Sequence, residues 1–293
     1  MGKCLRKKRM GLSYRARTSL TIAVSMVGSI ASVLSVLGYS LDEWTNCILL
    51  SIAIIIASFT VLFLVAYVYI GYRYGDSVSL SIRSMPVKIS VGDIFSTPGF
   101  KVIGCDTHFD TRVDDVVIAK TSLHGQLVLN HGKVDEIKAA VERRAKSLKL
   151  TKNKDGLYNF PLGTIVRYDS SVDNQTYLLL ALTEIKNDGG HYKALTSMYK
   201  YEQALCEMWN EIDCVYANQE IVLPILGSGI PKFIGGGKDK ENLLRCMLCT
   251  LKGSGVDLTS KVKIVIFGDA SGIPLYEYKN LFKSIHMGVN NAK

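Results

Sequence analysis

Two stretches near the N-terminus contain no charged side chain, and they constrain the fold more than any other feature of the sequence. Neither residues 18–41 nor residues 44–72 include Asp, Glu, Lys or Arg, and only Asp42 and Glu43 separate them. A helix rises about 1.5 Å per residue, so about 20 apolar residues cross the roughly 30 Å hydrocarbon core of a bilayer. Each stretch is long enough to cross, and the polar break allows only a tight turn. The sequence therefore predicts a transmembrane helical hairpin over residues 18–72.

A cleaved signal peptide and a buried core helix are the alternatives for the first stretch. The basic N-terminus fits a signal peptide, but the stretch is long for one and a second apolar stretch follows at once. A core helix of a soluble protein rarely lacks charge over such a length. Because neither stretch contains an ionisable residue, we expect an anchor or a subunit of a larger assembly rather than a transporter.

The net charge of +9 is concentrated before the hairpin. Residues 1–17 contribute +7, and Asp42 and Glu43 contribute −2, so the chain from Arg73 onward carries +9 − 7 + 2 = +4. Basic residues flank the hairpin on both sides and its turn is acidic, which predicts that both termini lie in the cytoplasm. The basic excess is thus a membrane signal, and we expect no nucleic-acid partner.

Small residues recur at helical spacing in the first stretch, and such rows let helix backbones approach closely in lipid. The row can pack on the second stretch of the same hairpin, on another copy of the chain, or on both. The pairs are Ser25 and Ser29, Gly28 and Ser32, and Ala31 and Ser35.

The seven cysteines have no spacing typical of a disulfide framework, which in a cytoplasmic domain indicates free thiols. Cys246 and Cys249, with Cys206 and Cys214, have the composition of a zinc site. Both pairs lie in stretches patterned as amphipathic helices, however, so we expect no metal and no cofactor.

From Arg73 onward, strand-like and helix-like segments alternate, which predicts an α/β domain with helices on both faces of a mixed sheet. Strand patterns fall at residues 78–82, 87–91, 100–104, 163–168, 175–182, 220–225 and 262–267. Helix patterns fall at residues 134–148, 197–216, 240–252 and 276–285. The expected segments are a basic cytoplasmic tail (1–17), the hairpin (18–72), a membrane-proximal connector (73–86) and a ligand-binding domain (87–293).

In such folds ligands bind at the carboxyl ends of strands, so the loops there carry the candidate site. The strongest is a glycine-rich loop that leaves a buried strand and includes Gly227, Ser228, Gly229 and Ile230. Glycine permits positive φ, and successive free amides form a nest suited to a diphosphate. The loop lacks the Lys-Ser/Thr ending of a Walker motif, and alone it is equally consistent with a structural turn.

A second loop places Asp93 and Ile94 directly after a strand. The carboxylate of Asp93 can accept a hydrogen bond from an exocyclic amine, and the next backbone amide can meet a ring nitrogen. Taken alone, a capping role for Asp93 is the better interpretation.

A third loop, residues 104–111, also follows a strand, and residues 122–125 come soon after it. Carboxylate and imidazole groups there can contact ribose hydroxyls, and backbone amides can contact phosphate. The residues are Asp106, His108, Asp110, Ser122 and Gly125.

Together these loops resemble the macro domain, an ADP-ribose-binding module, in order and spacing over about residues 87–283. The resemblance implies a three-layer α/β/α fold with an adenine site, a diphosphate site and a distal ribose site. The implied adenine residues are Asp93, Ile94 and Phe267. The implied diphosphate residues are Ser122, Gly125, Gly227, Ser228, Gly229 and Ile230. The implied residues around the distal ribose and its attached group are Asp106, His108, Phe109 and Asp110.

The sequence departs from macro domains that hydrolyse ADP-ribose conjugates. Residues 105–108 stand where many of those have Asn-Ala-Ala-Asn, and residues 120–125 lack their glycine triplet. This departure favours a sensor over an enzyme, so we expect no catalytic residue. His108 and His124 are then expected in hydrogen-bonding or packing roles, and Cys105 as a buried thiol.

A macro-like domain behind a two-span hairpin is similar to the membrane effector of type II Thoeris antiphage defence. The resemblance implies that the ligand is an NAD-derived ADP-ribose signal, histidine–ADP-ribose, made by a partner TIR-domain enzyme. It also implies homo-oligomerisation, disruption of a bacterial inner membrane, and growth arrest or cell death. A membrane-tethered ADP-ribosyl hydrolase and a scaffold that binds no nucleotide are the alternatives.

Overall fold

The computed structural model describes residues 2–36, 48–73, 77–154, 156–188, 191–229, 232–236, 239–268, 273–275 and 277–278. The chain divides into two compact units. One comprises residues 1–78 with 268–280, and the other residues 79–267 with 281–293.

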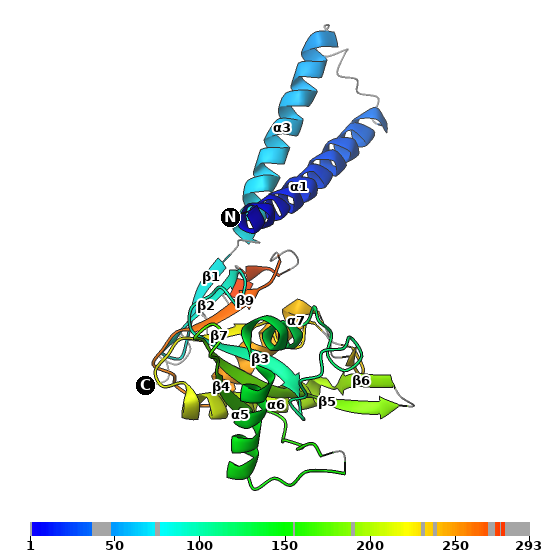
Figure 1. Ribbon diagram of the computed structural model, residues 1–293. Coiled ribbons are helices and arrows are strands. Elements are labelled where there is room, and N and C mark those ends of the chain that lie inside the picture. The colour runs from blue at the N-terminus through cyan, green and yellow to red at the C-terminus, as the bar shows by residue number, and fades with distance from the viewer. Residues whose placement is uncertain are drawn as a thin grey trace. The chain divides into compact units, whose positions relative to one another are not determined.

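Two long helices, α1 (Gly2–Val36) and α3 (Ile48–Arg73), form most of the first unit (Figure 1). By length and composition both can cross a membrane: residues 16–36 have a mean hydropathy of 1.9, and residues 48–72 one of 2.9. From residue 16 onward, most apolar side chains of the two helices are exposed. The helices match the two expected spans, and the expected turn between them lies outside the described residues.

The row of small residues on α1 is exposed rather than packed against α3. The hydroxyls of Ser29 and Ser32 donate to the carbonyls of Ser25 and Gly28, each at 2.8 Å, so they are satisfied within the helix. The buried positions on the two helices lie elsewhere, at Ser19, Ala23, Ser51, Ala66 and Ile70. Packing of α1 on α3 therefore leaves the row of small residues available for contact with another helix.

A nine-stranded mixed sheet organises the second unit. Its order is β1-β2-β9-β7-β3-β5-β6-β8, with β4 paired to β5 off this path. Strands β2, β9, β7, β3 and β5 pair in parallel, whereas β4 and β6 are antiparallel to β5. The strands are β1 (Ser77–Ile82), β2 (Met85–Val91), β3 (Phe100–Asp106), β4 (Ile165–Asp169), β5 (Thr176–Asp188), β6 (His191–Thr196), β7 (Ile221–Pro224), β8 (Lys232–Phe233) and β9 (Val262–Ile266).

Helices cover both faces of the sheet, which makes three layers (Figure 1). On one face, Ile137 and Ala140 of α5 (Val134–Ser147) share a core with Leu179 and Ala181 of β5. On the other face, α6 (Met198–Val215) contacts β5 and also packs on α7 (Lys240–Gly253). Residues on both sides of β5 are fully buried, as expected for an interior strand between two helical layers. The predicted fold class is confirmed.

The expected elements lie within two residues of their expected bounds, except that β5 continues to Asp188. Strands β6 and β8 were not expected, nor were the short helix α4 (Leu123–Gln126) and the π-helix η1 (Leu127–His131). These segments are too short to show a clear hydrophobic period. Strand β1 joins the sheet, so the expected connector supplies an edge strand. The helix expected at residues 276–285 lies almost wholly outside the described residues.

Gly163 fixes the approach of the 159–164 loop to α6. Its φ is +88°, and a Cβ there would collide with the Cβ of Glu207 and lie 2.8 Å from the carbonyl oxygen of Ala204. We expect Gly163→Ala to lower the free energy of unfolding by about 2–4 kcal/mol, because it adds both strain and overlap. Thermal unfolding of the full-length protein in detergent measures this.

Gly253→Ala is the matched control, because a Cβ at Gly253 meets nothing within 4 Å. We expect its melting temperature to be unchanged or slightly raised. A Gly163→Ala protein as stable as wild type would contradict the close packing of the loop on α6.

Candidate functional site

The carboxyl ends of neighbouring parallel strands bring the predicted loops together. In the register of the sheet, Val91 of β2 pairs with Ile266 of β9, and Pro224 of β7 pairs with Val265 of β9. The chain therefore leaves β2, β9 and β7 at one edge, towards Asp93, Phe267 and the glycine-rich loop. Strand β3 is parallel to β7 and ends at the same edge.

The Asp93 loop is a compact turn anchored to β9. The amide of Gly92 donates to the carbonyl of Ile266 at 3.0 Å, which places the loop beside Phe267. One carboxylate oxygen of Asp93 accepts the amide of Phe95 at 3.3 Å, and Asp93 is half-buried. Ile94 is buried, with 3% of its surface exposed. Asp93 thus caps its own turn and still reaches the surface.

Phe267 is the most exposed of the predicted adenine residues. It leaves 67% of its surface accessible at the end of β9. Its position beside the Asp93 loop suits a flat apolar ligand group.

The glycine-rich loop packs against Tyr201 at Gly227 and has free space beside Gly229. Gly227 has a φ of +77°, and a Cβ there would lie 3.2 Å from the ring of Tyr201. The hydroxyl of Tyr201 donates to the carbonyl of Leu226 at 2.9 Å, and Ser228 turns back to the carbonyl of Ile225 through its amide and hydroxyl. A Cβ at Gly229 would meet nothing within 4 Å. Ile230 lies outside the described residues.

The carboxylate of Asp106 closes the loop after β3. One oxygen accepts the amide of His108 at 2.7 Å, and the other accepts the amide of Asp110 at 3.3 Å. Asp106 is buried, and the ring Nδ1 of His108 lies 2.7 Å from the carbonyl oxygen of Tyr158. Asp106 and His108, two of the predicted ribose contacts, are therefore engaged within the protein.

Asp110 and Phe109 are likewise committed to the fold. Arg112 donates two hydrogen bonds to the carboxylate of Asp110, from Nη2 at 2.5 Å and from Nε at 2.9 Å. Burial alone raises the pKa of Asp110, but the hydrogen bonds and charge of Arg112 outweigh it, so the pKa lies below its ordinary value. The ring of Phe109 is buried and meets Phe160 edge-on, with centroids 5.0 Å apart.

The turn before α4 uses the amides that were expected to bind phosphate. The amide of Ser122 donates to the carbonyl of Ala119 at 3.0 Å, and the amide of Gly125 donates to the hydroxyl of Ser122 at 2.9 Å. His124 is buried; burial lowers its pKa, against the opposing effect of the Asp106 and Asp110 carboxylates. Burial thus favours the neutral form of the imidazole, whereas the two carboxylates favour the charged form.

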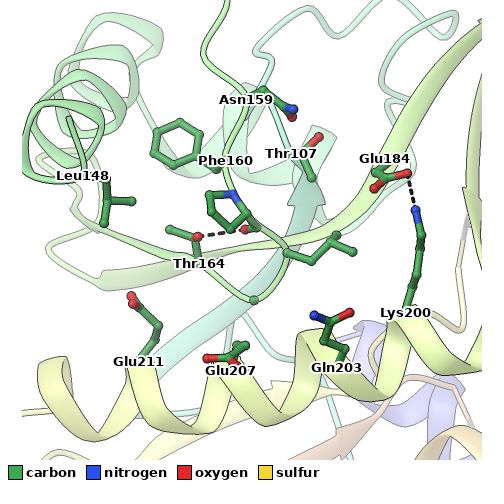
Figure 2. A pocket seen from close by; sticks show the side chains of 13 residues that line it. Thr107, Leu148, Asn159, Phe160, Thr164, Glu184, Lys200, Gln203, Glu207 and Glu211 are labelled. Atoms are coloured by element: carbon green, nitrogen blue, oxygen red, sulfur yellow. Dashed lines mark hydrogen bonds and ion pairs between the residues drawn. The ribbon is translucent and has the colours of Figure 1, made fainter. Parts of the chain in front are cut away.

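A cavity of about 630 Å³ lies between the 159–164 loop and α6 (Figure 2). Its lining includes the carboxylates of Glu184, Glu207 and Glu211 and the ammonium group of Lys200, which lies 2.7 Å from Glu184. None of the residues predicted for the distal site lines this cavity. Thr107, which lies between Asp106 and His108 in the sequence, does. Arg144 pairs with Glu211 at 2.5 Å, so a cationic group bound in the cavity would compete with Arg144 and Lys200 for these carboxylates.

Sequence reasoning missed this cavity because its walls come from elements far apart in the chain. The only local signal is the Pro-Leu-Gly turn at residues 161–163, which predicts a turn but no cavity.

The described residues contain no group of three or more His, Cys, Asp and Glu side chains that could hold a metal ion. Burial, with the nearby carboxylate of Glu202, raises the pKa of the Cys246 thiol to about 12.

Residues 87–267 match the model of the macro domain of the Thoeris protein ThsA. The chain belongs to this family. Every residue predicted for the site falls within the matched segment of the ThsA macro domain.

A Thoeris protein ThsA from Bacillus amyloliquefaciens (strain Y2) is 27% identical over 280 residues, which cover 92% of each chain. The similarity to ThsA therefore extends well beyond the macro domain.

Solved macro domains of Oceanobacillus iheyensis are also similar. The structure with ADP is 17% identical and covers 72% of this chain and 97% of its own, with a TM-score of 0.49. A mutant with ADPR is 18% identical and covers 71% of this chain and 99% of its own, with a TM-score of 0.48.

The Asp110–Arg112 pair predicts a pH dependence of stability. Because the folded-state pKa of Asp110 is lowered, its ionised carboxylate adds to the free energy of unfolding at any pH above the unfolded-state pKa. This stabilisation is lost as the pH falls through the folded-state pKa. We expect Asp110→Asn to lower the melting temperature at pH 7 by roughly 2–6 °C. The difference from wild type should shrink as the pH approaches 3 in a series of thermal melts. A difference that is constant with pH would contradict this assignment.

Proposed function

We propose that the protein is a membrane effector whose macro domain binds an NAD-derived ADP-ribose signal. The observation that carries the proposal is the shared strand edge, where Asp93, Ile94, Phe267 and Gly229 lie within the segment that matches the ThsA macro domain. In the proposal the ligand is histidine–ADP-ribose made by a TIR-domain enzyme. Binding drives the hairpins to assemble and to disrupt the inner membrane, and growth arrest or cell death follows.

Adenine and the diphosphate occupy adjacent parts of this edge in the proposal. The half-buried carboxylate of Asp93 accepts the exocyclic amine, the amide of Ile94 meets a ring nitrogen, and the exposed ring of Phe267 lies against the base. The open backbone at Gly229 approaches the diphosphate, because a residue without a side chain lets phosphate oxygens come close.

The group attached to the distal ribose enters the cavity beside Thr107 in this proposal. The carboxylates of Asp106 and Asp110, which were expected to bind it, are engaged by backbone amides and by Arg112. The cavity offers carboxylates and one ammonium group, which complement the amino, imidazole and carboxylate groups of an amino acid. Its volume is in the range of about 300–1,000 Å³ that small-molecule sites occupy.

Assembly follows from the exposed row of small residues on α1. Rows of this kind favour close helix–helix contact in lipid, and the hairpin itself leaves this one exposed. A ligand shifts such an equilibrium only by its differential affinity for the two states, so the proposal requires tighter binding to the assembled form.

A membrane-tethered ADP-ribosyl hydrolase is the second candidate. One observation favours it: the buried imidazole of His124, whose pKa burial lowers, interacts electrostatically with the carboxylates of Asp106 and Asp110, as a general base would. The departures from the hydrolase motifs at residues 105–108 and 120–125 weigh against it.

Loss of the Asp93 carboxylate should weaken ligand binding. We expect Asp93→Ala to reduce the affinity of the full-length protein for ADP-ribose by roughly ten- to hundredfold, because it removes a charge-assisted hydrogen bond. Isothermal titration calorimetry in detergent measures the affinity. Asp239→Ala is the control, since Asp239 also caps a turn through its carboxylate but belongs to α7. Equal binding by wild type and Asp93→Ala would contradict the proposed adenine site.

The effector and the hydrolase differ in what the full-length protein does to its ligand. We expect histidine–ADP-ribose to release dye from liposomes containing the protein and to be recovered intact by chromatography. His124→Asn should leave dye release unchanged. Conversion of the ligand to free ADP-ribose, lost in His124→Asn, would favour the hydrolase.

A further inference from the structure

The side chain of Phe95 ties the Asp93 loop to a histidine on another element. Its ring stacks face to face on His131, with centroids 4.2 Å apart and planes 6° from parallel. Phe95 directly follows Ile94, and its amide donates to the carboxylate of Asp93 at 3.3 Å. A shift of the Phe95 ring would therefore move the backbone that carries both proposed adenine contacts.

His131 is itself held in place by the sheet. Its Nδ1 lies 3.0 Å from a carboxylate oxygen of Asp173, and the hydroxyl of Tyr177 donates to the same oxygen at 2.6 Å. Tyr177 is fully buried in β5, and the other oxygen of Asp173 accepts the amide of Gln175 at 3.1 Å. The orientation of the imidazole is thus set by a carboxylate fixed to an interior strand.

Other contacts of the loop hold its backbone: the amide of Gly92 donates to the carbonyl of Ile266 at 3.0 Å, and Ile94 is buried in the core. The hydroxyls of Ser96 and Thr97 donate to the carbonyl of Asp93 at 3.1 and 2.8 Å, which closes the turn on itself. The stack of Phe95 on His131 links this turn to the β4–β5 side of the domain.

We infer that His131 is a positioning residue for base recognition: by stacking on Phe95, it holds Asp93 and Ile94 in the orientation that selects a 6-amino purine. The inference rests on the proposed function, because it concerns the same adenine site. His131 retains 28% and Asp173 24% of their side-chain exposure, so the pair lies at the margin of the core. Its loss should therefore affect selectivity more than folding.

The test compares two ligands on the full-length protein in detergent. ADP-ribose carries the exocyclic amine, and inosine diphosphate ribose replaces it with a carbonyl oxygen. We expect wild type to prefer ADP-ribose by roughly tenfold or more, the size of one hydrogen bond to a charged group. In His131→Ala the affinities for the two ligands should differ by no more than about threefold, mainly because ADP-ribose binds more weakly. His131→Phe keeps a ring to stack on Phe95 and should restore most of the preference.

Leu150→Ala is the matched control. Leu150 is partly buried and packs against the same core cluster as Phe95, but it belongs to the loop after α5. We expect this variant to lose stability and to keep the wild-type ratio. Equal loss of the ratio in Leu150→Ala and His131→Ala would show a merely structural role and overturn the inference.

Asp173→Asn provides a second variant in case His131→Ala does not fold. It weakens the hold on the imidazole while keeping the side-chain shape, so we expect a ratio between those of wild type and His131→Ala. If the affinity ratio is unchanged in Asp173→Asn or in a folded His131→Ala protein, the inference is overturned but the proposed function is not. Failure of wild type to bind either nucleotide overturns the proposed function, and the inference with it.

Discussion

Parallel pairing among β2, β9, β7 and β3 is the constraint on which the rest of the domain depends. It joins the chain near residue 91 to the chain near residue 266 and aligns the carboxyl ends of strands that are far apart in sequence. Parallel strands need both faces covered, which the helical layers on either side of the sheet provide. The loops that leave the common edge are therefore fixed at their base by the most buried part of the molecule, and only their tips are open.

Burial decides which charged groups at this edge remain available. A charge removed from water must be paired or hydrogen-bonded, and Asp106 and Asp110 meet this demand within the protein. Lys101, at the opposite end of β3, shows the same rule: its ammonium group is buried, burial lowers its pKa, and it donates to the side-chain oxygen of Gln175 at 2.6 Å. Asp93 is half-buried, and the carboxylates of Glu184 and Glu211 in the cavity are partly exposed although Lys200 and Arg144 pair with them.

The two long helices and the helices of the macro domain differ in how they distribute apolar side chains. Residues 16–36 of α1 and helix α3 expose most of their apolar side chains, whereas α5, α6 and α7 bury one face. In the proposed function, coupling between the ligand site and the hairpin requires that the ligand bind the assembled form more tightly than the unassembled form. The small residues on α1 and the strand edge of the macro domain are the two surfaces that such a coupling would connect.

The sequence by itself determined the spans and the fold class, because both follow from local patterns. Absence of charge over two long stretches is sufficient for the hairpin helices, and alternating strand and helix periods are sufficient for a three-layer domain. It also placed Asp93, Gly229 and Phe267 at one edge, since loops after parallel strands share that edge. Only the tertiary structure decided where side chains point: that Asp106 faces its own loop, that Phe109 enters the core, and that His131 stacks on Phe95. The physical reason is that a local hydrophobic period says nothing about side-chain partners, whether these lie in the same loop, as for Asp106, or far along the chain, as Asp173 does for His131.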